Sequence, residues 1–356
     1  MRICIDARSL DGRLTGMGKA LAYLLRQLRA DFPRHEYLTC SSPAAGSWRL
    51  PRQFLWEQLE LPWRALRSGA RVLHVPGGTA APLLGARRVV MTIHDLAPTR
   101  HPELLPHARS RWYWGRWVPL TARFADAILV PSAATKRDLI ALAGIPDARI
   151  TVTPWGVPLE VGEAPAPDVS RAVAARYGLP ERFVLYVGAI DRRKDYRTLL
   201  EALARLDPDV GLAVAGTVIE GRTDFRETIE AAGLHGRVRV LGYVPDVDLP
   251  ALYRAASVFV YPTFYEGFGL PVLEAMACGT PVITYNVTSL PEVTGDAARL
   301  LDLPVTPAAL AGEITRVMQD PDLRRELSAR GRERARAFDW ATTARLTAGV
   351  YEAVAG

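Results

Sequence analysis

The chain has 356 residues, of which 49% are hydrophobic and 23% are charged, and its formal net charge is +6. This length favours two domains, and the composition is that of a globular protein rather than a disordered or fibrous one. No apolar run reaches the roughly 18 residues of a membrane-spanning helix, and the apolar start is too short for a signal peptide, so we expect a cytoplasmic protein.

The three cysteines, Cys4, Cys40 and Cys278, are odd in number and lack metal-ligand spacing. We therefore expect buried thiols without a disulfide framework. The positive net charge suits an anionic ligand, a nucleic acid or an anionic membrane surface, and charge alone does not choose among them.

Short apolar runs alternate with amphipathic stretches along the chain, which is typical of parallel α/β folds. A first helix is expected from Gly16 to Asp31, because Leu21, Leu25 and Leu28 share a face. The strands expected in the first half are residues 2–6, 36–41, 71–75, 88–93, 127–131 and 149–154.

A proline-containing stretch without periodicity, residues 158–167, predicts a linker, after which the alternation restarts. The strands expected in the second half are residues 183–187, 211–215, 237–241, 257–261, 281–284 and 299–301. Two Rossmann-like halves place a ligand in the cleft between the carboxyl ends of their strands. The predicted division is a first domain over residues 1–160, a linker over 161–172, a second domain over 173–337 and a helical tail over 338–356.

The stretch Phe264–Pro281 lies between two of these strands and predicts a loop that runs into a helix. Pro271 suits the first turn of that helix, and Gly267 and Gly269 precede it. Free N–H groups at such a helix start favour phosphates and sugar hydroxyls. Glu266 and Glu274 bracket the loop, and a carboxylate accepts hydrogen bonds from two adjacent hydroxyls of a sugar.

A basic cluster, Arg192, Arg193 and Lys194, follows the strand at residues 183–187 and precedes a helix. Basic residues at the carboxyl end of a strand suit a diphosphate, although an isolated cluster of this kind is more often a solvated charge run. His94 ends the strand at residues 88–93 and is expected to face the same cleft. A lone histidine is more often structural, so both interpretations stay open.

Familiar nucleotide and metal motifs are absent from the sequence. The stretch Gly12–Lys19 has the wrong spacing for a P-loop, and the dinucleotide fingerprint lacks its third glycine. What remains is a turn at Gly16 and Gly18 where amides can approach an anion, or a plain tight turn. Three Asp-x-Asp pairs lie beside prolines and are interpreted as solvated turns, so no metal site is expected.

The segment Arg109–Arg123 interleaves basic and aromatic residues. It suits an anionic membrane surface or single-stranded nucleic acid. The alternative is a helix that packs its tryptophans into the core and exposes its arginines.

The segment Glu266–Glu274, with Gly267-Phe268-Gly269-Leu270-Pro271 between the two acids, closely resembles the Glu-x7-Glu signature of retaining glycosyltransferases of family 4. That family has the GT-B fold, an α/β fold of two Rossmann-like domains whose parallel sheets face each other across a cleft. The resemblance covers essentially the whole chain. Further similar blocks are Ile5–Arg8, Thr15–Gly18, Trp56–Gln58, Thr92–Leu96, residues 131–132 and 135–139, and Arg193–Lys194.

The resemblance implies a role for each matching residue. Glu274 should bind the ribose of a nucleotide sugar and Glu266 the transferred hexose, with main-chain amides from the loop Gly267, Phe268, Gly269 and Leu270. Arg193 and Lys194 should neutralise the diphosphate. Gly16 and Gly18 should approach the diphosphate or acceptor, and His94 the donor sugar. Many members have Gly-Arg where this chain has Gly188-Ala189, so we assign the phosphate contact to Arg193.

We therefore expect a retaining, metal-independent hexosyltransferase without cofactor. It would move a mannose-like or glucose-like hexose from a nucleoside diphosphate sugar to an acceptor hydroxyl in surface polysaccharide or lipid-linked glycan assembly. Contact with the inner membrane face and a tail that crosses back onto the first domain are further expectations. One alternative is a GT-B nucleotide-sugar epimerase. A second is a nucleic-acid-binding protein, which leaves Glu266 and Glu274 without a role.

Overall fold

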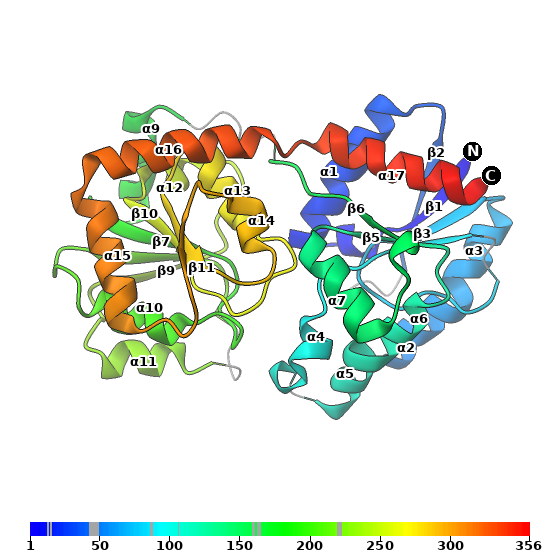
Figure 1. The fold of residues 1–356 in the computed structure, drawn as a ribbon, viewed down its shortest axis with the longest axis horizontal. Helices are drawn as coiled ribbons and strands as arrows, with labels where there is room; N and C mark the ends of the chain where they lie inside the picture. The colour runs from blue at the N-terminus through cyan, green and yellow to red at the C-terminus, as the bar shows by residue number, and fades with distance from the viewer. Residues whose placement is uncertain are drawn as a thin grey trace. The chain divides into compact units, whose positions relative to one another are not determined.

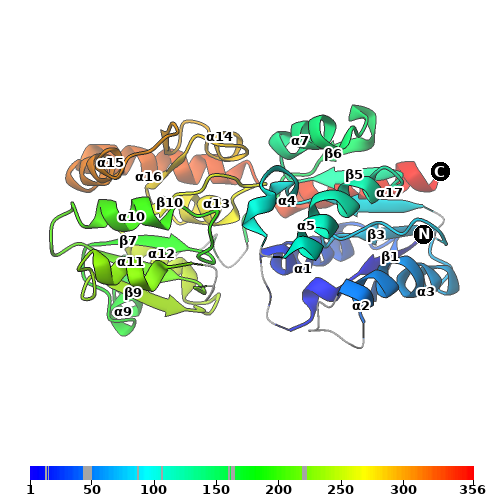
Figure 2. The same ribbon diagram turned by 90° about the horizontal axis from the view of Figure 1, so that it is seen from below.

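A computed structural model of the chain describes residues 1–12, 14, 16–42, 50–85, 88–105, 107–158, 161, 165–218 and 223–356. These residues form two compact units (Figures 1 and 2). Unit 1 contains Met1–Gly156 and Asp339–Gly356, and unit 2 contains Val157–Phe338. Thr15 of the family resemblance, residues 159–160 of the predicted first domain and residues 162–164 of the predicted linker lie outside the described residues.

Unit 1 is a parallel six-stranded sheet with the spatial order β2-β1-β3-β4-β5-β6. Its strands are β1 (Arg2–Asp6), β2 (Glu36–Cys40), β3 (Val72–Val75), β4 (Val89–Thr92), β5 (Ala127–Val130) and β6 (Ile150–Val152). Side chains alternate between the two faces of a strand. Ile3 and Ile5 accordingly pack under helices α1 (Gly16–Asp31) and α17 (Trp340–Ala355), whereas Cys4 packs on the other face with Trp56.

The helices of unit 1 cover both faces of its sheet (Figure 1). They are α1 (Gly16–Asp31), α2 (Leu50–Leu55), α3 (Leu61–Arg67), α4 (Ala97–Arg100), α5 (Ala108–Trp112), α6 (Val118–Ala122), α7 (Ala133–Ala143) and α17 (Trp340–Ala355), with π-helical turns η2 (Trp56–Glu60) and η4 (Tyr113–Trp117) and 3-10 turns η1 (Arg8–Leu10), η3 (Pro102–Leu104) and η5 (Asp147–Arg149). Helix α7 shows why such elements begin and end where they do. Ser132 caps its first turn by accepting the Thr135 amide (3.1 Å), and Gly144 ends it in the left-handed conformation.

Unit 2 repeats the architecture, with the strand order β12-β11-β10-β7-β8-β9 and all neighbours parallel. Its strands are β7 (Phe183–Val187), β8 (Gly211–Ala215), β9 (Val238–Gly242), β10 (Val258–Tyr261), β11 (Val282–Tyr285) and β12 (Arg299–Leu301). Its helices are α9 (Pro167–Arg176), α10 (Tyr196–Leu203), α11 (Phe225–Ala231), α12 (Leu249–Ala255), α13 (Leu270–Ala277), α14 (Leu290–Thr294), α15 (Pro307–Gln319) and α16 (Pro321–Arg336). Figure 1 shows α10 and α11 on one side of this sheet, and α9, α12, α13 and α16 on the other.

The predicted fold class is confirmed, because all twelve predicted strands are present and both sheets are parallel. The strand order of unit 2 changes direction between β7 and β10, and the helices that follow these two strands lie on opposite sides of the sheet (Figure 1). Such a switch point is where ligands bind in open α/β sheets. In the described part of the chain, no helix has the length and apolar character required to cross a membrane.

Candidate functional site

The loops that follow β7 and β10 meet at one edge of the unit 2 sheet. The loop after β7 carries Arg193 and Lys194, and the loop after β10 carries Glu266. Lys194 forms an antiparallel backbone bridge with Thr263, and the Phe264 amide donates to the Arg193 carbonyl (3.1 Å). The backbone itself therefore brings the basic cluster and the acidic loop together.

The side chains of Lys194 and Glu266 form a buried ion pair at this junction. The Lys194 ammonium contacts Glu266 Oε1 and donates to the Tyr261 hydroxyl (2.6 Å), and the two side chains are 4% and 11% exposed. Tyr261 and Thr263 each donate to Glu266 Oε1 at 3.3 Å. These contacts all reach Oε1, and Oε2 has no partner among the described residues, so this oxygen can accept hydrogen bonds from a ligand.

The charge of Glu266 follows from this environment. Burial opposes ionisation of the carboxyl, but the positive charges of Lys194 and Arg193 outweigh it and hold the pKa of Glu266 below its ordinary value. Burial lowers the pKa of Lys194, and the Glu266 charge opposes that shift. Glu266 is therefore a carboxylate at neutral pH, which accepts hydrogen bonds and has no proton to donate.

The backbone of Glu266 is held by residues that precede helix α14. The Glu266 amide donates to Thr288 Oγ1 (3.0 Å), and Ser289 Oγ donates to the Glu266 carbonyl (2.9 Å). Thr288 has a φ of 47°, in the left-handed region that β-branched residues rarely adopt. A strained backbone of this kind persists only where the surrounding structure holds it in place. Here the hydrogen bonds of Thr288 and Ser289 hold the acidic loop.

The loop Gly267–Leu270 leads directly into α13. Gly269 has a φ of +97°, and a Cβ there would lie 2.6 Å from Leu290 Cδ2, so the turn requires glycine. Phe268 is buried and packs edge to face on Phe338. Among the described residues, the amides of Gly269 and Leu270 have no acceptor, and they lie at the positive end of the helix dipole.

Glu274 lies in the second turn of α13 and is 5% exposed. Its Oε2 accepts a hydrogen bond from the Tyr253 hydroxyl (2.8 Å), which α12 supplies. Burial, and then the Glu274 charge, raise the pKa of Tyr253, so the phenol stays neutral and acts as the donor. A ligand that reaches Glu274 would therefore share the carboxylate with Tyr253.

A cavity of about 530 Å³ adjoins Lys194. Its lining residues come from the β7–α10 loop, the start of α10, the start of α11 and the β10 loop: Arg192, Lys194, Asp195, Tyr196, Arg197, Thr223, Asp224 and Phe264. This volume lies within the range of small-molecule sites. Its position at the switch point supports ligand binding beside the Lys194–Glu266 pair.

His94 lies in unit 1, two residues beyond β4. Its Nε2 donates to the Pro76 carbonyl (2.6 Å), and its Nδ1 is buried without a hydrogen-bond partner in the described part of the chain. Burial lowers the pKa of His94, despite the Pro76 contact that opposes the shift. Because a carbonyl can only accept, the proton resides on Nε2, and Nδ1 presents a lone pair that can accept a hydrogen bond.

Gly16 and Gly18 begin α1 in unit 1 but differ in their surroundings. A Cβ on Gly18 would lie 2.3 Å from the Ser9 carbonyl oxygen, so this glycine permits a close approach to its own loop. A Cβ on Gly16 would have no atom of a described residue within 4 Å, and Gly16 is exposed. The tight-turn interpretation therefore accounts for Gly18, and Gly16 keeps an open face.

Comparison with known proteins gives matches along the chain. Residues 16–161 match the family Glycosyltransferase Family 4, and residues 175–334 match Glycosyl transferases group 1. The O-antigen chain mannosyltransferase B of Escherichia coli is 36% identical over 272 residues, which cover 74% of this chain and 70% of that protein. The chain belongs to the GT-B glycosyltransferases of family 4. A D-inositol 3-phosphate glycosyltransferase of Salinispora arenicola is 31% identical over 95% of this chain and 74% of that protein.

Solved structures support the assignment of this chain to the glycosyltransferase family. Sucrose-phosphate synthase from Thermosynechococcus elongatus has a TM-score of 0.76 at 26% identity, covering 99% of this chain and 98% of that chain. The Anabaena protein HepE, crystallised with UDP-glucose, has a TM-score of 0.78 at 19% identity and covers 99% of both chains. The second likeness shows the shared GT-B fold.

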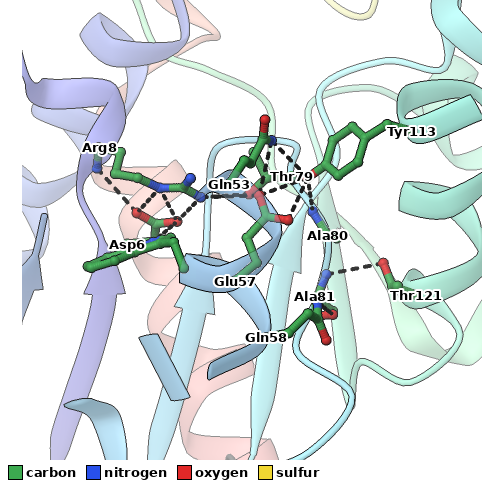
Figure 3. A network of polar contacts seen from close by, with 11 residues as sticks. Asp6, Arg8, Gln53, Glu57, Gln58, Thr79, Ala80, Ala81, Tyr113 and Thr121 are labelled. Atoms are coloured by element: carbon green, nitrogen blue, oxygen red, sulfur yellow. Dashed lines mark hydrogen bonds and ion pairs between the residues drawn. The ribbon is translucent and has the colours of Figure 1, made fainter. Parts of the chain in front are cut away.

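The glycosyltransferase also contains a buried polar network in unit 1 (Figure 3). Arg8 Nη2 contacts Asp6 Oδ2 at 2.7 Å and Glu57 Oε1 at 3.3 Å. The Tyr113 hydroxyl donates to Glu57 Oε2 (2.6 Å), and Gln53 Nε2 donates to Glu57 Oε1 (3.1 Å). The network joins two blocks of the family resemblance, Ile5–Arg8 and Trp56–Gln58, which sequence reasoning left without a role.

Several site residues of the glycosyltransferase were not predicted from the sequence. Tyr261 and Thr263 hold Glu266, Tyr253 holds Glu274, and Thr288 holds the acidic loop. Tyr261 and Thr263 carried a usable signal, because polar groups at the carboxyl end of a parallel strand face the ligand edge. Tyr253 and Thr288 carried none, since their contacts depend on the packing of separate elements.

The Asp-x-Asp pairs of the glycosyltransferase serve as caps and surface ion pairs. Asp320 caps α16 by accepting the Leu323 amide (2.9 Å), Asp248 pairs with Arg176, and Asp209 pairs with Arg182. The part of the chain that the structure describes has no group of three or more His, Cys, Asp or Glu side chains arranged for a metal ion.

Proposed function

We propose that this glycosyltransferase is a retaining hexosyltransferase of surface polysaccharide or lipid-linked glycan assembly. The donor is a nucleoside diphosphate sugar with a mannose-like or glucose-like hexose, and the acceptor is a hydroxyl of a glycan or lipid-linked glycan. The observation that carries the proposal is the buried Lys194–Glu266 pair beside Arg193 at the switch point of unit 2. The mannosyltransferase relatives from Escherichia coli support the choice of hexose.

The roles of the unit 2 residues follow from the hydrogen-bonding groups that they place at this edge of the sheet. Glu266 Oε2 accepts from hexose hydroxyls, and the amides of Gly269 and Leu270 donate to the bound donor. Glu274 accepts from the ribose while Tyr253 holds its other side. Arg193 and Lys194 stabilise the charge that grows on the diphosphate as the glycosidic bond breaks, so the reaction needs no metal ion or cofactor.

Retention follows from attack on the face that the leaving group departs from. The bond between the anomeric carbon and the diphosphate oxygen breaks, and the acceptor oxygen forms its bond on the same face. The acceptor proton passes to the departing phosphate. Glu266 is ionised and therefore does not protonate the departing phosphate, and the neutral His94 can accept a hydrogen bond at Nδ1 from a sugar hydroxyl.

An assay of donors and product stereochemistry tests the proposal. The wild type is incubated with GDP-mannose, UDP-glucose and related donors and a mannose-terminated oligosaccharide, with and without EDTA. We expect a product whose anomeric configuration, measured by NMR, matches the donor, at an unchanged rate in EDTA. Inversion, or loss of activity in EDTA that added metal restores, contradicts the corresponding part of the proposal.

Matched carboxylate variants assign the activity to the site. Glu266→Gln should lower kcat by at least about 100-fold, the loss typical of a removed electrostatic group in an active site. Glu227→Gln changes an exposed glutamate of α11 and should leave the rate unchanged. Conversion of the donor sugar to its epimer without any acceptor would instead favour the nucleotide-sugar epimerase.

We also infer that unit 1 contacts an anionic membrane through the segment Arg109–Arg123. Trp114 and Trp117 pack against the core, as the alternative of a core-packed helix predicted, but Trp112 and Leu120 are 50% and 46% exposed, and Phe124, which directly follows the segment, is 61% exposed. Exposed apolar side chains beside arginines suit the interface of an anionic bilayer.

Co-sedimentation with phosphatidylglycerol vesicles tests the membrane contact. We compare the wild type with the triple variant Arg109→Glu, Arg111→Glu, Arg116→Glu, whose charges oppose the anionic lipids. The wild type should sediment with the vesicles and the variant should stay in solution. Equal sedimentation of the two proteins removes the inference.

A further inference from the structure

A second cavity of unit 2, of about 670 Å³, opens where strands β10 and β11 begin. Its walls are the end of α12, the turn between α13 and β11, and one face of α16: Arg254, Ala255, Ala256, Ser257, Gly279, Thr280, Pro281, Pro321, Arg324, Arg325, Ser328 and Arg332. Glu266 follows the other end of β10, and four strand residues span about 13 Å. This cavity is therefore separate from the candidate donor site.

Four arginines give the cavity a concentrated positive charge. Arg324, Ser328 and Arg332 are spaced four residues apart on α16 and share one face of that helix, while Arg254 approaches from α12. The described lining contains no carboxylate. Arg325 alone among the four forms an ion pair with a described acidic residue, Asp322.

The arginine groups leave hydrogen-bonding capacity unused inside the cavity. Arg254 Nε is buried and has no hydrogen-bond partner among the residues that the structure describes. Leaving a buried donor without a partner is unfavourable, so a ligand that pairs with it recovers that cost. The guanidinium of Arg332 lies over Gly279, where a Cβ would be 1.7 Å from Nη1 and 2.9 Å from Ser328 Oγ, so the absent side chain of Gly279 leaves room for both polar groups.

The volume and the side chains of this cavity favour a phosphate group over other anionic ligands. Guanidinium groups bind phosphate oxygens through two parallel hydrogen bonds. The volume exceeds what a single carboxylate fills. The lining contains no aromatic side chain on which a nucleic acid base could stack.

We propose that this cavity binds a phosphorylated ligand with at least two negative charges, at a site distinct from that of the sugar donor. The phosphate belongs either to a soluble phosphorylated metabolite or to the headgroup of an anionic lipid. In both cases Arg254 would bind the phosphate from α12, and Arg324, Ser328 and Arg332 would bind it from one face of α16.

Calorimetric titration with inorganic pyrophosphate tests the site. Because pyrophosphate can also occupy the donor site, all variants are made in an Arg193→Gln background. The affinity should fall at least tenfold when Arg254→Gln and Arg332→Gln are added. It should not change with Arg336→Gln, a control whose side chain is 75% exposed near the end of α16 and outside the cavity. Thermal unfolding of each variant confirms that it folds.

Vesicles of phosphatidylglycerol, with phosphatidylcholine as the control, distinguish the two sources. Binding of pyrophosphate alone assigns the phosphate to a soluble ligand. Sedimentation with phosphatidylglycerol that the Arg254→Gln, Arg332→Gln pair abolishes assigns it to a lipid headgroup. The proposal is overturned if this pair changes neither pyrophosphate nor vesicle binding, or if Arg193→Gln by itself removes all pyrophosphate binding while the vesicles also fail to bind.

Discussion

The carboxylate of Glu57 is fully buried in unit 1 and accepts hydrogen bonds from Tyr113 and Gln53 beside Arg8 (Figure 3). Burial raises the pKa of Glu57 to about 7, because desolvation outweighs these contacts. The folded state therefore binds a proton that the unfolded state releases near pH 4.5. The stability that this proton adds is present below pH 4.5 and is lost as the pH rises through 7.

Replacing Glu57 by Gln removes this titration. At pH 5 the variant should be about as stable as the wild type, and at pH 8 it should be more stable by up to about 3 kcal/mol, since each pKa unit corresponds to about 1.4 kcal/mol. Urea unfolding across this pH range measures the difference, with Glu60→Gln on the same turn as the control for removing a carboxylate. A stability difference that does not vary with pH contradicts the prediction.

The cysteines differ in their surroundings more than their sequence spacing indicates. Neighbouring strands β1 and β2 bring Cys4 Sγ and Cys40 Sγ within 3.1 Å, and Cys40 is partly exposed, contrary to the expectation that all three thiols are buried. The hydrogen bond from Cys4 lowers the pKa of Cys40 to about 7, whereas burial raises the pKa of Cys278 to about 12.

Iodoacetamide at pH 7.5 should therefore modify Cys40 at least tenfold faster than Cys278, because the thiolate is the reacting form. Peptide mass spectrometry after short reaction times measures the rates. A Cys40→Ser protein should lose the fast phase. Equal labelling of Cys40 and Cys278 in the folded protein would show that the thiol pair does not favour the thiolate.

At the scale of elements, the start of helix α1 contains two glycines, Gly16 and Gly18, whose surroundings differ although the sequence could not distinguish them. Gly18→Ala places a Cβ against the Ser9 carbonyl and should destabilise unit 1 by about 1–3 kcal/mol, as overpacking does. Gly16→Ala meets no neighbour among the described residues and should stabilise the helix by up to about 1 kcal/mol. Thermal unfolding measures both effects. Equal destabilisation by the two substitutions contradicts this assignment.

The Gly16→Ala and Gly18→Ala substitutions also distinguish an effect on folding from an effect on ligand binding. Because Gly16→Ala keeps the fold, any loss of donor or acceptor binding in that variant reports a direct contact at the start of α1. Unchanged kcat and KM would remove Gly16 from the proposed binding residues.

Secondary structure was predictable because its signals are local. Apolar runs bounded by turn residues marked the strands, and Gly269 with Pro271 marked the start of α13. The partners of the acidic residues were not predictable. Tyr113 lies 56 residues from Glu57, and Tyr253 lies 21 residues from Glu274, so packing decides these contacts. The π-helical turns that carry Glu57 and Tyr113 also have no sequence rule.

At the scale of the whole molecule, the chain returns to its first unit at the end. Helix α17 packs beside α1 in unit 1, where Trp340, Ala344, Ala348 and Tyr351 are buried (Figure 1). The Tyr351 hydroxyl also bonds to Nδ1 of the buried His74 (2.7 Å). The core of unit 1 is therefore complete after the last residues of α17 are in place, although unit 2 comes earlier in the chain.

Truncation after Phe338 should accordingly unfold unit 1 while unit 2 keeps its fold. The deletion removes Trp340 and Tyr351, and burial of large apolar side chains contributes about 1.5–3 kcal/mol each. It also leaves His74 Nδ1 without its partner, at a cost of about 1–3 kcal/mol. These losses, together with the newly exposed face of α1, are comparable to the whole stability of a domain, about 5–15 kcal/mol.

Limited proteolysis with mass spectrometry measures the outcome unit by unit. In the truncated chain, cleavage sites within residues 1–156 should become accessible at low protease concentration, and sites in β7 to β12 should stay protected because their core lies within unit 2. A chain that lacks only Gly356, which is exposed, provides the control. Equal protection of unit 1 in the truncated and control chains would mean that its sheet and α1 are stable without α17.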